Sequence, residues 1–245
     1  MVNPAIISTH AAGAAIKRSV LIHVRAKYDL PLGFRSPFNT QSPAMPLVIV
    51  KLGGSLLSLP DLADRIRRLL AHQPNDRILI VVGGGAATDV VRDWSRQHSL
   101  SEETAHWLAL RSLSLTRTLV KELLPECAEV TSPEEALRHW ENSSSSVLLN
   151  VECYLRDVAA TDDNPLPHTW DVTSDSIAAW IAARWSADEL ILVKSTDLGT
   201  GITFEQARQA GLVDAHFPNI AIEVSRISWC NLLAESPRPR PWLQS

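Results

Sequence analysis

The chain has 245 residues, of which 45% are hydrophobic and 20% are charged. This length is sufficient for one large α/β domain or two small ones with a substantial core. No run approaches the roughly 18–20 apolar residues that a membrane helix requires. We therefore expect a soluble, cytoplasmic protein with no membrane partner.

The net charge of −4 is unevenly distributed along the chain. Residues 1–46 contain five of the 23 basic and one of the 27 acidic side chains, which leaves the remainder with a net charge of −8. Such a surface is poorly suited to nucleic acid. Three widely spaced cysteines, Cys127, Cys153 and Cys230, indicate free thiols in a reducing compartment. The eight histidines lack metal-ligand spacing, so no metal site is predicted.

Composition divides the chain into three parts. Residues 1–46 are rich in Ala, Ser and Pro, and we expect a weakly ordered extension with at most a short helix near residues 11–25. Residues 47–235 have the regular pattern of a single α/β domain. Residues 236–245 are predicted to form a proline-rich tail.

Apolar strands alternate with helices from residue 47 onward. Strands are expected at residues 47–51, 78–82, 147–151, 189–193 and 220–224. Helices are expected at residues 61–72, 86–97, 102–124, 133–140, 173–185 and 204–209, with Val90, Val91 and Trp94 facing inward from the second of these. This alternation is typical of a mainly parallel sheet covered by helices on both faces.

Two of the expected strands end in glycine-rich loops. Gly53, Gly54 and Ser55 follow the first strand, and Gly83, Gly84 and Gly85 follow the second, so the loops hold five of the ten glycines. Ligands of open α/β sheets bind at the carboxyl ends of strands, where glycine lets backbone amides approach an anion. The loops therefore predict a two-walled anion site, although ordinary tight turns are the alternative interpretation.

Three charged residues are expected at the same edge of the sheet. Lys51 ends the first strand and Lys194 ends the strand at residues 189–193. Asp175 opens a helix, where it either caps the helix or holds the lysines in position; Asp171 is a weaker candidate. Phosphoryl transfer requires charge compensation and in-line positioning. A phosphate or carboxylate acceptor is already ionised at pH 7 and needs no general base.

Four segments together resemble the amino-acid kinase superfamily, which includes acetylglutamate, aspartate, uridylate and isopentenyl phosphate kinases. They are VIVKLGGSLL (48–57), IVVGGGAATDVV (80–91), WDVTSDSIAAWIAA (170–183) and LILVKSTDLGTG (190–201). The resemblance covers residues 47–221. It implies a three-layer αβα sandwich, ATP with Mg²⁺ as phosphoryl donor, a phosphorylated small-molecule substrate and a homo-oligomer.

The resemblance also implies roles for individual residues. Lys51 would contact the transferred phosphoryl group, Asp175 would orient the lysines, and Lys194 would complete the catalytic set. Phosphate and nucleotide would bind at Gly53, Gly54, Ser55, Asp197 and Gly199, and the acceptor at Gly83, Gly84, Gly85 and Asp171. The chain departs from the family pattern after Lys194, where the usual Asp-Gly-(Val/Ile)-Tyr segment is replaced by TDLGTG (196–201).

Further segments, HSLSEETAHWLALRSL (98–113) and ARQAGLVDAHF (207–217), are similar to the small kinases of methanofuran biosynthesis. Those kinases convert aminomethyl-furanmethanol phosphate to its diphosphate. Trp107, Trp170 and Trp180 are expected in the core or at a subunit interface, and alternatively against a flat furan ring.

Three other interpretations remain at this point. One is a uridylate or acetylglutamate type of kinase, and another is a non-catalytic oxyanion binder similar to the molybdenum storage proteins. The third is a nicotinamide enzyme, because Gly83-x-Gly85-x-x-Thr88 is close to the dinucleotide fingerprint. It lacks the final Gly or Ala, and Lys51 has no place in that scheme.

Overall fold

The computed structural model describes residues 45–73, 77–159, 162 and 164–242. All of these belong to one compact unit, residues 36–245. The helix expected near residues 11–25 lies outside the described residues. Within the described part, no helix combines the length and apolar character needed to cross a membrane.

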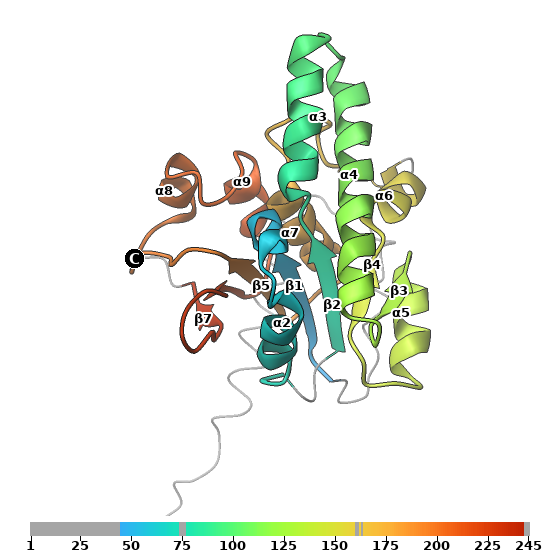
Figure 1. Ribbon diagram of the computed structural model, residues 1–245, viewed down its shortest axis with the longest axis vertical. Coiled ribbons are helices and arrows are strands. Elements are labelled where there is room, and N and C mark those ends of the chain that lie inside the picture. The colour runs from blue at the N-terminus through green and yellow to red at the C-terminus, as the bar shows by residue number, and fades with distance from the viewer. Residues whose placement is uncertain (1–44, 74–76, 160–161, 163, 243–245) are drawn as a thin grey trace, which may run out of the picture. The chain divides into compact units, whose positions relative to one another are not determined.

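The described strands form a seven-stranded sheet in the order β3-β4-β2-β1-β5-β6-β7 (Figure 1). All neighbours are parallel except β6 and β7, which are antiparallel. Nearly every residue of the central strands is buried, as expected for a sheet covered on both faces. The strands are β1 (Leu47–Leu52), β2 (Arg77–Val82), β3 (Ala128–Val130), β4 (Val147–Leu149), β5 (Glu189–Lys194), β6 (Ile227–Asn231) and β7 (Arg240–Pro241).

Two apolar cores lie on opposite faces of the sheet. Because side chains alternate along a strand, Ile49 of β1 joins one core, and Val48 and Val50 join the other. This gives three layers, so the predicted αβα sandwich is confirmed. The helices are η1 (Gly54–Ser58), α2 (Leu62–Leu70), α3 (Gly85–Gln97), α4 (Glu102–Leu123), α5 (Pro133–Trp140), α6 (Val151–Ala159), α7 (Ser174–Arg184), α8 (Phe204–Gln209) and α9 (Phe217–Ala221).

Two element predictions are wrong. Residues 220–224, expected as a strand, contain the end of helix α9, which has Pro218 in its first turn, and the turn that follows it; the strand comes later, at Ile227–Asn231. Proline suits a helix N-terminus because no intrahelical donor is lost there. The strand expected to reach Val151 ends at Leu149, and Val151 begins helix α6 instead.

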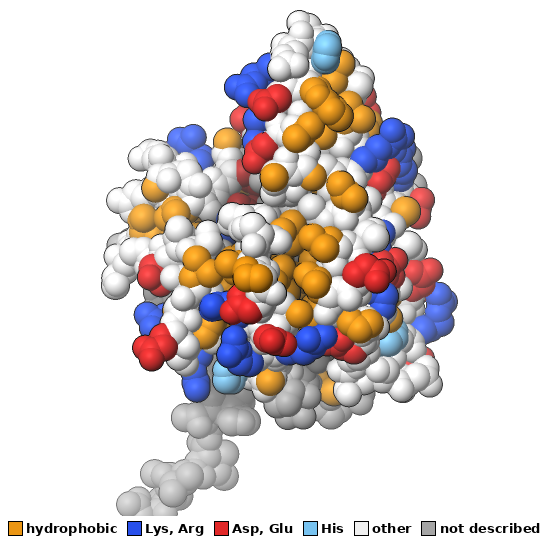
Figure 2. All heavy atoms as spheres, viewed as in Figure 1, with side chains coloured by type: hydrophobic (Ala, Val, Ile, Leu, Met, Phe, Trp, Pro, Cys, Tyr) orange, Lys and Arg blue, Asp and Glu red, His pale blue; other side chains and the backbone are white. Residues whose placement is uncertain are grey.

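The inward face of α3 also differs from the prediction. Val91 is buried, but Val90 and Trp94 are 44% and 51% exposed. The buried face consists of Val91 and Ser95, four residues apart, where α3 packs on α4. The two helices stand side by side and extend beyond the sheet (Figure 1). Hydrophobic side chains remain at the surface over them (Figure 2).

Residues 236–242, expected as part of a tail, pack back onto the domain. Trp242 is 7% exposed and its backbone amide donates to the carbonyl oxygen of Ile227 at 2.8 Å. Its ring contacts the rings of Phe204, Phe217 and Trp229, with centroids 4.7–6.0 Å apart. The aromatic cluster anchors this end of the chain in the core.

The three cysteines are free thiols, as predicted. Burial raises the pKa of Cys127 and of Cys230 to about 11. Both are therefore protonated near neutral pH and are poor nucleophiles, since the thiolate is the reactive form.

Candidate active site

Lys51, Asp175 and Lys194 form one buried charge cluster. β1 and β5 lie side by side in parallel, so the lysines near their carboxyl ends meet at the same edge of the sheet. Lys51 Nζ lies 2.7 Å from Oδ1 of Asp175, and Lys194 Nζ lies 2.7 Å from Oδ2. Lys194 Nζ also donates to the carbonyl oxygen of Leu212 at 2.8 Å. One carboxylate thus fixes two ammonium groups from neighbouring strands.

The cluster is strongly coupled electrostatically. Burial acts to raise the pKa of Asp175, but the two ammonium groups outweigh it and hold that pKa below its ordinary value. Burial, together with repulsion from Lys51, lowers the pKa of Lys194 to about 8, although Asp175 opposes this shift. Two cations share one anion here, which leaves a net positive charge for an anionic ligand.

The two glycine loops are in direct contact beside this cluster. A Cβ atom on Gly54 would lie 2.1 Å from the backbone nitrogen of Gly85, a distance that backbone atoms cannot tolerate. Gly85, the first residue of α3, has a φ of +52°, which also favours glycine. The glycines therefore let the loop after β1 meet the N-terminus of α3 without intervening side chains.

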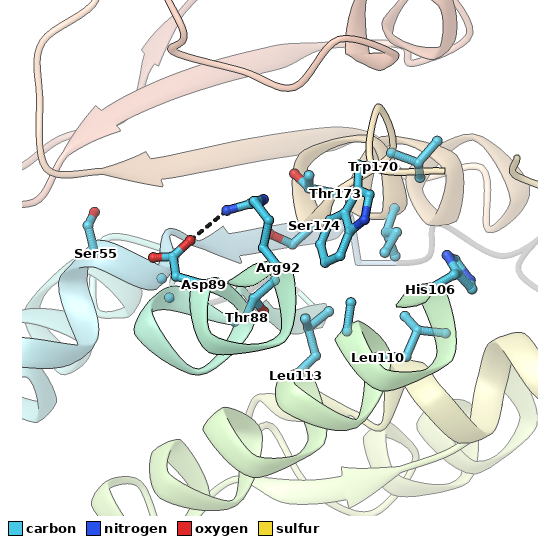
Figure 3. Close-up of a pocket in the computed structure, with 16 residues that line it drawn as sticks. Ser55, Thr88, Asp89, Arg92, His106, Leu110, Leu113, Trp170, Thr173 and Ser174 are labelled. Atoms are coloured by element: carbon cyan, nitrogen blue, oxygen red, sulfur yellow. Dashed lines mark hydrogen bonds and ion pairs between the residues drawn. The ribbon is translucent and has the colours of Figure 1, made fainter. Parts of the chain in front are cut away.

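A pocket begins at these loops and extends along α4 and α7. Ser55 lies at one end and His106 at the other (Figure 3). The guanidinium carbon of Arg92 lies 5.0 Å from the ring centroid of Trp170. A guanidinium nitrogen of the same arginine forms an ion pair with Oδ1 of Asp89 at 2.6 Å. The lining residues are Gly54, Ser55, Gly84, Gly85, Thr88, Asp89, Arg92, His106, Ala109, Leu110, Leu113, Trp170, Val172, Thr173, Ser174 and Ile177.

The predicted acceptor residues are only partly brought together in this pocket. Gly84 and Gly85 line it, and Gly83 directly precedes them. Asp171 is exposed and is not among the lining residues; its carbonyl oxygen accepts from the backbone amide of His216 at 3.0 Å. Of the three tryptophans considered for the pocket, Trp170 lines it, whereas Trp180 belongs to the core.

A histidine pair at the far end of the pocket has no counterpart in the sequence prediction. The rings of His106 and His168 stack with centroids 4.1 Å apart, and His168 Nδ1 bonds to the carboxylate of Glu103. Burial, with repulsion from His168, lowers the pKa of His106 to about 4. His106 is therefore neutral at pH 7 and presents a neutral imidazole to the pocket.

A second pocket lies beyond β5 and β6. Trp229 lines it, and the same ring lies 5.6 Å from Lys194 Nζ. Lys51, Asp175 and Lys194 themselves line neither pocket; Ser174, which precedes Asp175 in the chain, lines the first one, and Trp229 links Lys194 to the second. Of the predicted phosphate- and nucleotide-binding residues, Gly54 and Ser55 line the first pocket, whereas Asp197 and Gly199 line the second. Its lining residues are Asp197, Leu198, Gly199, Thr200, Gly201, Trp229, Asn231, Ala234, Ser236, Arg238, Arg240, Pro241 and Trp242.

Asp214 is an organising residue that the sequence interpretation missed. Thr173, the N-cap of α7, makes no capping bond with its own side chain. Asp214 supplies the acceptor instead: its Oδ2 receives the backbone amides of Thr173 and Ser176, both at 2.9 Å. Its Oδ1 receives the amide of Phe217 at 3.0 Å, at the start of α9. Asp214 thus fixes the helical turn that carries Asp175.

Comparison with known proteins agrees with this geometry. Residues 46–198 match the model of the amino acid kinase family. The chain belongs to this family. Its predicted place among the phosphotransferases of the amino-acid kinase superfamily is thereby confirmed.

One curated relative is the [5-(aminomethyl)furan-3-yl]methyl phosphate kinase of Methanocaldococcus jannaschii, which is 27% identical over 153 residues. The match covers 61% of this chain and 66% of that relative. Family membership and this relative support a kinase function for the chain without fixing its substrate.

Solved structures of other kinases share the fold. The UMP kinase of Ureaplasma parvum superposes with a TM-score of 0.57 at 13% identity, covering 79% of this chain and 92% of that one. The aspartate kinase of Synechocystis gives a TM-score of 0.53 at 16% identity, covering 81% of this chain and 40% of that one. Identities this low show similarity of fold alone.

Proposed function

We propose that the protein is an ATP-dependent kinase that transfers the γ-phosphoryl group to the phosphate of a small acceptor. The observation that carries this proposal is the buried Lys51–Asp175–Lys194 cluster beside two touching glycine loops. Such a site concentrates positive charge and backbone donors where phosphoryl transfer develops negative charge.

The reaction needs no proton transfer from the protein. An oxygen of the acceptor phosphate attacks the γ-phosphorus, a new P–O–P linkage forms, and the bond to the β-phosphate oxygen breaks to release ADP. The total charge of the reactants equals that of the products when the acceptor is a dianion. Lys51, Asp175 and Lys194 are ion-paired with one another, which suits a reaction that needs no general base.

The first pocket suits the acceptor and the second suits the donor. The first opens at the glycine loops, and the second contains the predicted nucleotide residues Asp197 and Gly199. Among the described residues, no group of three or more His, Cys, Asp or Glu side chains is arranged to cage a metal. This fits Mg²⁺, which is usually held by substrate phosphates, waters and one or two carboxylates. Asp197 would hold it here, and the metal would neutralise phosphate charge.

We further propose that the acceptor is aminomethyl-furanmethanol phosphate, the substrate class in the name of the curated relative. The ring of Trp170, held under Arg92, offers a flat surface for a furan. At the other end, the neutral imidazole of His106 can accept a hydrogen bond from an ammonium group. Leu110, Leu113 and Ile177 line the same pocket and offer apolar contacts to a furan ring.

The test is an assay of purified protein with MgATP and four acceptors: the aminomethyl-furan phosphate, UMP, isopentenyl phosphate and acetylglutamate. We expect ADP release coupled to a diphosphate product with the furan phosphate only. Turnover with a different acceptor would support the kinase activity but refute the proposed identity of the acceptor. Tight binding of phosphate or molybdate with no turnover on any acceptor would refute the kinase and favour a binding protein.

A further inference from the structure

A segment near the C-terminus forms a wall of the second pocket. We call residues 236–242, Ser-Pro-Arg-Pro-Arg-Pro-Trp, the C-terminal strap. Trp242 fixes it to the core, since its indole Nε1 also donates to the carbonyl oxygen of Ile202 at 2.8 Å. Within the strap, β7 pairs with β6 through Arg240 opposite Trp229. The strap is therefore held at both its strand pairing and its final aromatic residue.

Two arginines of the strap line the second pocket. Arg238 and Arg240 are exposed, and neither forms an ion pair with any described residue. They alternate with Pro237, Pro239 and Pro241, whose rings fix φ and so reduce the number of backbone conformations open to the strap. Ser236, Arg238, Arg240, Pro241 and Trp242 line the pocket, whereas Pro237 and Pro239 do not. The strap thus places both arginines at one cavity.

We propose that Arg238 and Arg240 bind the phosphates of the donor nucleotide. This proposal rests on the proposed function. The two arginines would supply positive charge on the side of the site where the chain lacks the usual family segment after Lys194. Guanidinium groups suit this role, because their planar donors match phosphate oxygens in pairs. Asp197 is the one acidic residue among those lining the pocket, so the two arginines leave it with a net positive charge.

The position of the pocket relative to the charge cluster supports the assignment. The ring of Trp229 lies 5.6 Å from Lys194 Nζ, and its centroid is 5.6 Å from that of Trp242 in the strap. Trp229 therefore connects the pocket to Lys194. The phosphates of a bound nucleotide then extend from the strap toward the transfer site.

Calorimetric titration of the full chain with MgATP and with adenosine tests the proposal. We expect the Arg238→Gln/Arg240→Gln double variant to bind MgATP at least about tenfold more weakly, with a much smaller change for adenosine. The matched control is Arg68→Gln/Arg138→Gln, which removes two exposed arginines on α2 and α5 that form no ion pair with described residues. Thermal melts check that both double variants are folded.

The outcomes separate this proposal from the proposed function. Unchanged MgATP affinity in the strap variant, or an equal loss for adenosine, would refute the role in phosphate binding. An equal loss in the control variant would refute it too, because the effect would then follow from net charge. Wild-type protein that binds MgATP through the strap but phosphorylates none of the acceptors would support this proposal and refute the kinase.

Discussion

Asp214 accepts both the backbone amide and the hydroxyl of Thr173, at 2.9 and 2.8 Å, across 41 positions of the chain. Two residues before Asp214, the carbonyl oxygen of Leu212 receives Lys194 Nζ. One short segment therefore holds the helix that carries Asp175 and also the second lysine that Asp175 binds. The loop between α8 and α9 fixes the charge cluster from outside the sheet.

Asp214→Asn should lower both stability and turnover. An asparagine amide group would turn N–H donors toward at least one of the three backbone amides that the carboxylate now receives. We expect the free energy of unfolding to fall by about 1–3 kcal/mol, the range for a lost cap or unsatisfied buried donor. Because Asp175 would lose its fixed position, kcat should fall while the KM for the acceptor changes little. An unchanged kcat in a destabilised variant would contradict the positioning role.

Lys51→Met should reduce turnover far more than stability. The variant removes the charge expected at the transferred phosphoryl group, and loss of one such group typically costs about 10²–10³ in kcat. Asp175 keeps Lys194 as a partner, so no buried carboxylate is left unpaired. Steady-state kinetics and thermal melts measure the two effects, with Arg68→Gln as a control for loss of one surface charge. A fall in melting temperature with unchanged kcat would contradict a catalytic role.

The pH profile of turnover should show a basic limb from Lys194. Its pKa is lowered to about 8 by burial and by Lys51, with Asp175 and Asp214 opposing the shift. The side chain of Lys194 is positively charged below that pKa and neutral above it. Loss of this charge should lower kcat as the pH rises through about 8. In Lys194→Arg, whose guanidinium stays charged, the limb should disappear even if the maximal rate is lower. The same limb in both proteins would exclude Lys194 as its source.

Gly54→Ala should separate the two glycine loops. The added methyl group would lie 2.1 Å from the nitrogen and 2.4 Å from the Cα of Gly85, so backbone has to move. Overpacking of about 1–3 kcal/mol corresponds to a fall in melting temperature of roughly 3–10 °C for a domain of this size. Gly199→Ala is the control for stability, because its methyl group would meet nothing within 4 Å. Equal melting temperatures for the two variants would contradict the loop contact.

The exposed face of α3 offers a test of the expected homo-oligomer. Val90 and Trp94, one turn apart, leave a large apolar surface in water, flanked by the Asp89–Arg92 and Asp93–Arg96 ion pairs. If a second copy covers this face, Trp94→Lys should lower the molecular mass measured by analytical ultracentrifugation. Gln97→Lys, at another exposed position of α3, should leave the mass unchanged. A wild-type monomer would refute the prediction.

Local sequence patterns were sufficient to predict the central strands of the sheet and the charge cluster. The runs that form β1, β2 and β5 are apolar and rich in β-branched residues, and each is followed by a glycine-rich loop or ends in a lysine. This pattern predicts buried strands of a parallel sheet. The sequence predicts that Lys51 and Lys194 lie close together, because the carboxyl ends of parallel strands share one edge of the sheet, and β1 and β5 are indeed parallel neighbours.

Contacts between distant segments account for most of what the sequence did not reveal. The hydrogen bond from the Thr173 amide to the Asp214 carboxylate and the stack of His106 on His168 have no local signature. Helix α6 was missed for a different reason: its first residue, Val151, continues the apolar run of β4 and reads as more strand. Only the packing of the whole domain decides such cases.

The pairing of β5 with β6 also limits how far the chain can be shortened. The family match ends at residue 198, before β6 and the strap. A fragment cut there would leave β5, the strand of Lys194, as a bare sheet edge, because residues 190–194 now pair with residues 227–231. Unpaired apolar edges promote aggregation. A fragment that keeps β5 paired must therefore include β6, well past the part of the chain that identifies the family.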